Sequence, residues 1–230
     1  MYKNEDQVGA AIRESGVKRS DVFVVTKLSA EKELHSKEGC VAALRESLKR
    51  LGLAFVDLYL IHSPKPGNIL DTWRGMLDAR RLGLCKAVGV SNFGVKQLEG
   101  IAAAGLELPE VNQIEFHVWL QQTACRAYMS KNNIVCMGYC PLARCKRLET
   151  LADMAERKGK TAAQIAIRWS LQMKVVTIPK SSKATRISEN ADVFDWALNG
   201  EEMRILGGFD DGFKASGSVN AMDIPWEDVR

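Results

Sequence analysis

Short apolar runs alternate with segments of helical spacing along this chain, and the alternation restricts its fold more than any other feature. Apolar residues recur every three or four positions in the intervening segments, which is typical of amphipathic helices. The runs themselves are apolar throughout rather than every second residue, so we expect strands covered on both faces. Strands that alternate with helices favour a parallel α/β sheet, as an open doubly wound sheet or a closed (β/α)8 barrel. The predicted strands are Val22–Thr26, Phe55–Ile61, Cys85–Val90, Val111–Phe116, Ile134–Tyr139 and Val175–Ile178. The predicted helices are Ser36–Leu51, Ile69–Leu82, Val95–Ala104, Gln122–Lys131, Leu148–Lys158, Thr161–Gln172 and Ala184–Ala191.

The composition is that of a water-soluble globular chain. Its 230 residues are 46% hydrophobic and 26% charged, enough for a single domain with a substantial core. Charge interrupts every apolar run, and the N-terminus lacks the apolar stretch of a signal peptide, so we expect neither a membrane span nor secretion. The net charge of +4 is dispersed, which argues against nucleic-acid binding. The six cysteines form no CxxC pair or zinc spacing, so we expect thiols in a reducing compartment, the cytoplasm, and no metal site.

The polar residues near the predicted strand ends favour the barrel over the open sheet. The glycine fingerprint GxGxxG of a dinucleotide-binding Rossmann domain is absent, and Gly89 alone cannot replace it. In a (β/α)8 barrel, the active site lies at the carboxyl ends of the strands. The chain has polar side chains at those ends: Lys27, His62, Ser91, Asn92, Glu115, His117, Tyr139 and Lys180.

Lys27 and His62 follow two consecutive predicted strands, so a parallel sheet would place them at the same edge. A lysine there can lower the pKa of a neighbouring acid, and a histidine can donate or accept a hydrogen bond. Taken singly, the lysine could simply be solvated and the histidine structural. Together they form a candidate site.

The segment from Ile178 to Arg186 combines serine hydroxyls, cations and the start of a predicted helix. Such a combination can bind phosphate, and barrels often bind phosphate after their last strands. The alternative is a serine that caps the helix beside solvated charges.

Five motifs, in order, resemble the aldo-keto reductase family. They are Leu60-Ile-His-Ser-Pro64, Gly89-Val-Ser-Asn-Phe93, Val111-Asn-Gln-Ile-Glu115, Tyr139-Cys-Pro-Leu142 and Ile178-Pro-Lys-Ser-Ser-Lys-Ala-Thr-Arg186. The likeness extends from Tyr2 to about Trp196. It implies a (β/α)8 TIM barrel and an oxidoreductase that reduces aldehydes or ketones to alcohols with NADPH.

The resemblance also implies the site residues. The catalytic residues would be Tyr2 as proton donor, Lys27 and His62. A phenol that titrates near 10 is a poor proton donor at neutral pH unless a cation such as Lys27 stabilises the phenolate. The cofactor residues would be Ser91, Asn92 and Gln113 at the carboxamide, Tyr139 stacked on the nicotinamide, Lys180, Ser181 and Arg186 at the 2′-phosphate, and Glu189 and Asn190 at the adenine.

The chain departs from the family pattern at its start. The family's catalytic aspartate, five residues before the tyrosine, has no counterpart here, and neither do the first two strands and the first helix. We therefore expect one barrel domain over residues 1–230 that is incomplete at the N-terminus, with weak NADPH binding and with poor carbonyl reduction or none. The intact family fold would be monomeric, but open strand edges would permit association.

Two other functions are compatible with the sequence. A non-catalytic nicotinamide-nucleotide-binding or regulatory protein could use the same barrel, and the absent aspartate favours that alternative. A different barrel enzyme could act on phosphorylated metabolites through the cluster around Lys180 and Arg186.

Overall fold

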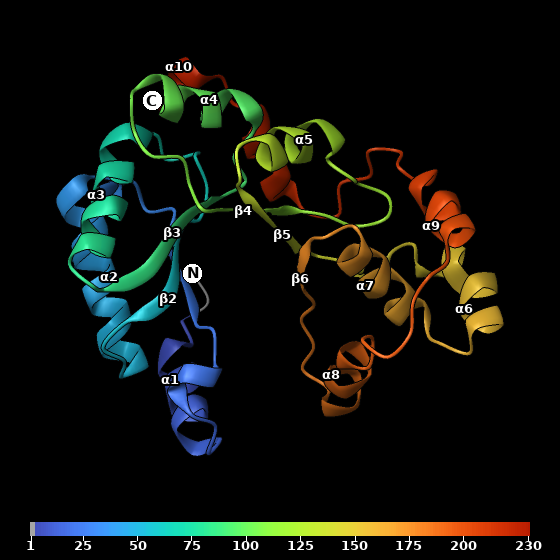
Figure 1. Ribbon diagram of the computed structural model, residues 1–230. Coiled ribbons are helices and arrows are strands. Elements are labelled where there is room, and N and C mark those ends of the chain that lie inside the picture. Colours follow the sequence, from blue (N-terminus) through green and yellow to red (C-terminus); the bar gives the residue numbers. More distant parts are fainter. Residues whose placement is uncertain (1–2) are drawn as a thin grey trace. The chain divides into compact units, whose positions relative to one another are not determined.

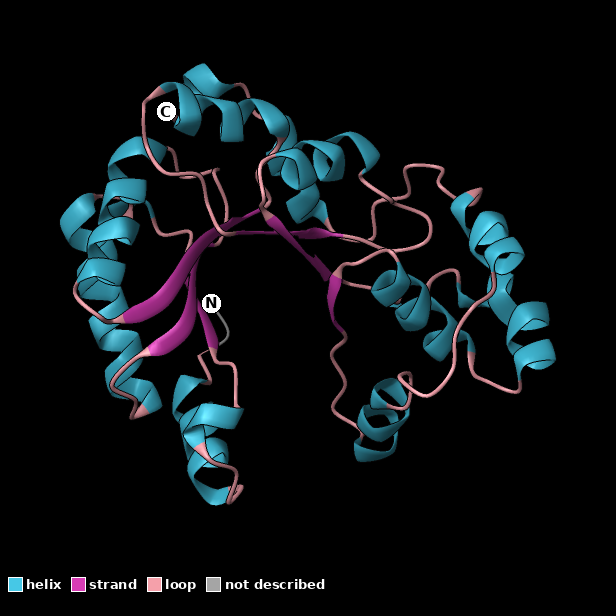
Figure 2. Ribbon diagram, viewed as in Figure 1, coloured by secondary structure: helices cyan, strands magenta, loops and turns pink. Residues whose placement is uncertain are grey.

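The computed structural model describes residues 3–230, which fall into two compact units (Figure 1). Unit 1 contains the described residues up to Asn112 together with the C-terminal residues 220–230, and unit 2 contains residues 113–219. Tyr2 lies outside the described residues. Both units contain parallel strands with helices, the α/β class predicted from the sequence (Figure 2).

Unit 1 is built on three parallel strands in chain order: β1 (Val25–Leu28), β2 (Val56–Ile61) and β3 (Cys85–Ser91). Leu28 pairs with Ile61, and Ile61 pairs with Val90, so the three strands end at the same edge. All six residues of β2 are buried, as predicted from its continuous apolar run. The helices of this unit are α1 (Glu5–Glu14), α2 (Lys37–Leu51), α3 (Ile69–Arg81), α4 (Val95–Ala103) and the short α10 (Trp226–Val229).

Helix α2 shows how the sequence sets these boundaries. The Ser36 side chain accepts a hydrogen bond from the Gly39 amide at 3.0 Å and caps the helix start. Gly52 ends the helix with a φ of 66°, a left-handed conformation that glycine adopts without strain. Between these ends, Leu44 and Leu48 are among the residues that face the core.

Unit 2 contains β5 (Val135–Tyr139) and β6 (Val176–Ile178), which pair in parallel with Tyr139 opposite Ile178. Its core includes Phe116 and Trp169, whose rings stack at 5.0 Å between centroids. The helices of this unit are α5 (Thr123–Lys131), α6 (Ala152–Lys158), α7 (Ala162–Gln172), α8 (Ala184–Ala191) and α9 (Gly200–Gly207).

Strand β4 (Val111–Glu115) contributes residues to both units. At its start, the Glu110 amide donates to the Val88 carbonyl of unit 1 at 3.1 Å. Just after its end, the Phe116 amide donates to the Tyr139 carbonyl of unit 2 at 3.2 Å.

Two details differ from the sequence prediction. The first strand covers Val25–Leu28 rather than Val22–Thr26, so Lys27 lies inside the strand instead of following it. The β-branched run begins before the strand does: Phe23 is 65% exposed, and the residues around it lead into the strand. Helices α1, α9 and α10 were not predicted from the sequence, and each has a single buried residue: Gly9, Leu206 and Val229. Within residues 3–230, no helix is both long and apolar enough to cross a membrane.

Candidate functional site

Lys27 and His62 lie at the carboxyl edge of the unit 1 strands. Lys27 is the penultimate residue of β1, paired with Leu60, and His62 directly follows β2. Burial lowers the pKa of Lys27 to about 8. Burial also lowers the pKa of His62 to about 4, and the positive charge of Lys27 contributes to that shift. The structure thus brings the two predicted residues together, with the histidine neutral at pH 7 beside a lysine that is mostly charged.

The turn after β3 is held rigidly in unit 1. Asn92 has a left-handed φ of 61°, and its amide donates at 3.1 Å to the His62 carbonyl and to the Ser91 hydroxyl. The Asn112 amide donates to the Phe93 carbonyl at 2.8 Å and fixes the next residue of the turn. Ser91 and Asn92 are buried at 1% and 2% exposure, so their polar groups are positioned before any ligand binds. No role for Asn112 was predicted from the sequence.

Gln113 and Tyr139 belong to unit 2. Gln113 is buried, and its amide contacts the Met137 sulfur at 2.8 Å. Tyr139 ends β5 and is half-buried. Burial raises the pKa of Tyr139, and the negative charge of Glu115 adds to the increase. The Tyr139 phenol is therefore neutral across the physiological pH range and can serve as an aromatic surface rather than as an acid.

The segment from Lys180 to Asn190 places exposed cations around the start of α8. Lys180 and Arg186 are exposed, and neither forms an ion pair with any residue that the structure describes. The Ser181 hydroxyl accepts a hydrogen bond from the Lys183 amide at 3.1 Å. Two cations without a carboxylate partner and a hydroxyl beside a helix start are the donor set that a phosphate monoester requires, so this segment fits the 2′-phosphate of NADP.

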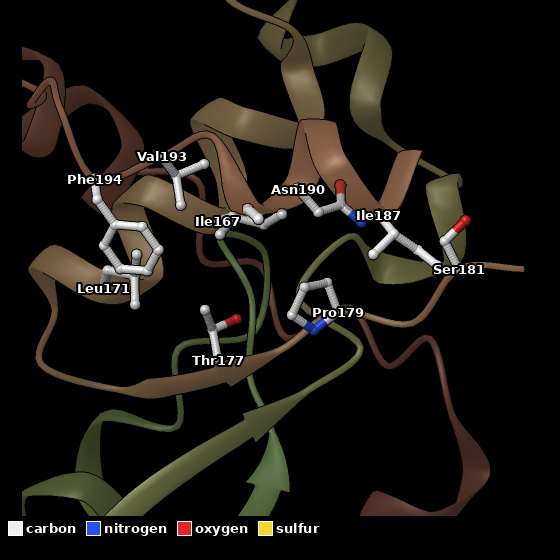
Figure 3. A pocket seen from close by; sticks show the side chains of 10 residues that line it. Ile167, Leu171, Thr177, Pro179, Ser181, Ile187, Asn190, Val193 and Phe194 are labelled. Atoms are coloured by element: carbon white, nitrogen blue, oxygen red, sulfur yellow. The ribbon is translucent and has the colours of Figure 1, made fainter. Parts of the chain in front are cut away.

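Glu189 and Asn190 lie at the end of α8 and differ from each other. The Glu189 carboxylate accepts a hydrogen bond from the Thr161 hydroxyl at 2.7 Å, which ties it to the start of α7. Asn190 is 9% exposed. It lines a pocket of about 280 Å³ together with Ser181 (Figure 3). The pocket is mostly apolar, and its other lining residues are Ile167, Leu171, Thr177, Pro179, Ile187, Ala191, Val193 and Phe194.

Two polar residues that the sequence placed at a strand end without assigning a role are Glu115 and His117. Both are completely buried, and the His117 Nε2 atom lies 3.2 Å from the Glu115 carboxylate. The backbone amides of Ala215 and Ser216 donate to the same carboxylate. A sequence pattern could not show these contacts, because the partners are about one hundred residues apart.

Comparison with known proteins decides the family. The model of the Aldo/keto reductase family matches residues 1–211. An aldo-keto reductase of Mycobacterium tuberculosis is 42% identical over 217 residues, which cover 92% of this chain and 76% of that protein. The glyoxal reductase of Bacillus subtilis is 43% identical over 205 residues, which cover 88% of this chain and 74% of that enzyme. The chain belongs to the aldo-keto reductase family.

Solved structures of the family confirm the predicted fold class. An aldo-keto reductase from a Medee basin deep-sea metagenome library superposes with a TM-score of 0.87 at 41% identity, covering 93% of this chain and 80% of that one. A Bombyx mori aldo-keto reductase in complex with NADP superposes with a TM-score of 0.87 at 33% identity, covering 97% of this chain and 80% of that one. The fold is therefore the α/β fold of the aldo-keto reductase (β/α)8 type, and residues 3–230 contribute six of its strands.

The comparisons also establish the class of chemistry. Aldo-keto reductase relatives and a structural neighbour complexed with NADPH support an NADP-dependent oxidoreductase.

All six cysteines within the described chain are free thiols. Among residues 3–230 there is no group of three or more histidine, cysteine, aspartate or glutamate side chains that could hold a metal ion.

Proposed function

We propose that this aldo-keto reductase reduces the carbonyl group of a small aldehyde or ketone to an alcohol with NADPH. The observation that carries the proposal is the pair at the edge of unit 1, a neutral His62 beside a charged Lys27 whose pKa is close to 8. A carbonyl that accepts hydride develops negative charge on its oxygen, which requires a hydrogen-bond donor and a source of protons. NADPH would supply the hydride.

The catalytic residues divide these tasks. Tyr2 donates the proton to the carbonyl oxygen. Lys27 supplies the positive charge that a phenol requires to act as a proton donor near neutral pH. His62, which burial keeps neutral, donates a hydrogen bond that orients the carbonyl.

The cofactor residues are proposed on the basis of the family motifs and of their environment. In unit 1, Ser91 and Asn92 offer fixed polar groups to the carboxamide of the nicotinamide. In unit 2, the family motifs assign Gln113 to the carboxamide and Tyr139 to stacking on the nicotinamide ring, which leaves one ring face for hydride transfer. Lys180, Ser181 and Arg186 bind the 2′-phosphate, with Glu189 and Asn190 at the adenine. The NADP named with the Bombyx mori relative supports this choice of cofactor.

The first experiment tests the choice between NADPH and NADH. The full chain is titrated with each nucleotide, and binding is measured by the quenching of tryptophan fluorescence. We expect Arg186→Ala to weaken NADPH binding about tenfold or more, because a charge-assisted hydrogen bond is lost, and to leave NADH binding unchanged. Arg204→Ala, an exposed arginine of α9, is the matched control and should change neither. An equal loss for NADPH and NADH would contradict the assignment of Arg186.

The second experiment tests turnover. The full chain is assayed with NADPH and a series of small aldehydes, among them glyoxal because the Bacillus subtilis relative is a glyoxal reductase. We expect reduction at a low rate that Tyr2→Phe abolishes. Saturable NADPH binding with no turnover of any aldehyde would instead support the non-catalytic nucleotide-binding function.

The free cysteines are consistent with the proposed cytoplasmic location.

A further inference from the structure

The buried carboxylate of Glu115 has no part in the reaction described above, yet it is among the most heavily bonded side chains of unit 2. It lies at the last position of β4 with no exposed surface. One carboxylate oxygen accepts from the Ala215 amide at 2.5 Å, and the other accepts from the Ser216 amide at 3.0 Å. Burial of a carboxylate is costly unless such donors compensate it, so these contacts specify where the segment around Ser216 must lie.

Aromatic and backbone contacts hold the same segment against the residues that follow β4. The His117 ring packs near the rings of Trp119 and Phe213, at 5.8 and 6.3 Å between centroids. The Phe213 amide donates to the Trp119 carbonyl at 3.1 Å. His117 also contacts the Glu115 carboxylate at 3.2 Å. The segment from Phe213 to Ser216, here called the anchored segment, is therefore fixed to the end of β4 at several points.

The anchored segment ends at a residue that touches Tyr139. The Ser216 hydroxyl accepts a hydrogen bond from the Ser218 amide at 3.3 Å. The Ser216 side chain also interacts with the Tyr139 phenol, and while burial raises the pKa of the phenol, this interaction lowers it. A chain of contacts thus leads from Glu115 through the Ser216 backbone and hydroxyl to the Tyr139 phenol. It fixes the far end of the ring on which, under the proposed function, the nicotinamide stacks.

We propose that Glu115 is a positioning residue of the nicotinamide site, which orients the Tyr139 ring by anchoring Ser216. The inference rests on the proposed stacking role of Tyr139. Glu115 touches neither substrate nor cofactor in this scheme. Its contribution is the preorganisation of an aromatic surface, so its loss weakens nucleotide binding.

A double-mutant cycle tests the proposal through NADPH affinity, measured by tryptophan fluorescence. Glu115→Gln places an amide group opposite two backbone donors, and we expect NADPH binding to weaken about tenfold. Ser216→Ala removes only the hydroxyl and should weaken binding about threefold. In a Tyr139→Phe background, Ser216→Ala should have no further effect and Glu115→Gln a much smaller one. Glu149→Gln, an exposed glutamate of the same unit, is the matched control and should bind NADPH as the wild type does.

Hydrogen exchange supplies a readout that does not depend on the cofactor. The Ala215 and Ser216 amides should exchange faster in Glu115→Gln and at the wild-type rate in Glu149→Gln. Unchanged exchange, or equal losses of affinity in the wild-type and Tyr139→Phe backgrounds, would overturn the positioning role while the proposed function stands. If the wild-type chain bound no NADPH, the proposed function itself would fail, and the nicotinamide role of Glu115 with it. Should Glu115→Gln fail to fold, the cycle of Ser216→Ala with Tyr139→Phe tests the link from Ser216 to Tyr139 on which the proposal depends, and additive losses of affinity there would overturn it.

Discussion

The two ends of strand β2 carry ionisable side chains whose pKa values are both lowered, with opposite consequences. Asp57 is the second residue of the strand, and His62 follows its last. For an aspartate, a lower pKa favours the charged form. For a histidine, a lower pKa favours the neutral form. The strand therefore begins beside a stabilised charge and ends beside a group that is kept uncharged.

At the start of β2, two cations and a backbone amide compensate the buried charge of Asp57. Arg19 and Lys86 form ion pairs with the Asp57 carboxylate at 2.8 and 2.9 Å, and the Val24 amide donates to it at 2.9 Å. These donors lower the pKa of Asp57 although burial opposes them. Both cations also lie over the Phe55 ring, at 4.7 and 4.8 Å from its centroid. This cluster stabilises the fold.

At the carboxyl end of the unit 1 strands, the environment disfavours charge instead of stabilising it. Lys27 and His62 are buried, and burial disfavours the charged form of each. Residues with pKa values shifted in this way are candidates for catalysis. Under the proposed function, the start of β2 contributes stability and its end contributes chemistry, as is usual for barrels.

The largest effect is expected at the chemical end. Lys27→Met should lower the rate of NADPH-dependent aldehyde reduction by roughly 10²–10⁴-fold, the usual contribution of a group that assists proton transfer. Lys96→Met, an exposed lysine of α4, is the control and should retain the wild-type rate. Steady-state kinetics of both variants provide the measurement. A Lys27→Met enzyme within threefold of wild type would remove the distinction between the two ends.

The same substitution should stabilise the fold. The pKa of Lys27 is about 8 in the folded chain and near 10.5 in the unfolded one, so between these values the unfolded chain binds more protons and stability rises with pH. At pH 7 the buried charge therefore costs free energy. We expect Lys27→Met to raise the free energy of unfolding at pH 7 by about 2 kcal/mol, with a smaller gain at pH 10. A loss of stability in urea denaturation at pH 7 would contradict this.

The pH dependence of the reaction is the next largest effect. Lys27 loses its proton as pH rises through about 8, so the reduction rate should fall above pH 8, approaching tenfold per pH unit. His62 has a pKa near 4 and stays neutral, so no break is expected near pH 6.5. A rate profile from pH 5.5 to 9.5 checks both points. A rate that fell on acidification through 6.5 would show that His62 titrates.

The contrast also shows what sequence could predict. Lys27 and His62 could be paired from sequence because consecutive parallel strands end at one edge, and the register of β1 and β2 places both residues there. Asp57 could not be recognised, since its partners come from a 3₁₀ helix at Arg19–Asp21 and from β3, at distances that no local pattern encodes. Glu115 was placed at a strand end for the same reason as His62, but its role depends on Ala215, one hundred positions away. Periodicity predicts most elements and their approximate ends, whereas long-range contacts decide what a polar group does.

At the stabilising end, Asp57→Asn should destabilise the fold by about 2 kcal/mol at pH 7, because two cations and an amide lose a charged acceptor. The folded pKa of Asp57 lies below its usual value of 3.8. Its contribution is therefore present above about pH 4 and is lost as pH falls through the folded pKa. Urea denaturation at pH 7 and pH 3 should show the difference between variant and wild type shrinking. Asp195→Asn, an exposed aspartate, is the control. A difference that stayed constant with pH would mean that the charge is irrelevant.

The smallest effect separates the two cations of the Asp57 cluster. The Lys86 side chain is 61% exposed and that of Arg19 is 25% exposed, although both pair with Asp57 at similar distances. Solvent and salt screen an exposed pair, so Lys86→Met should cost about 0.5 kcal/mol, and less in 0.5 M salt. Arg19→Met should cost more, because Arg19 also donates to the Val22 and Phe55 carbonyls. Urea denaturation of both variants at two salt concentrations gives the ranking.

Neither Lys86→Met nor Arg19→Met should change the pH profile of aldehyde reduction, since the charge of Lys27 at the other end of the sheet depends on burial and not on this cluster. A shift of that profile in Lys86→Met would show that the two ends of β2 are electrostatically coupled.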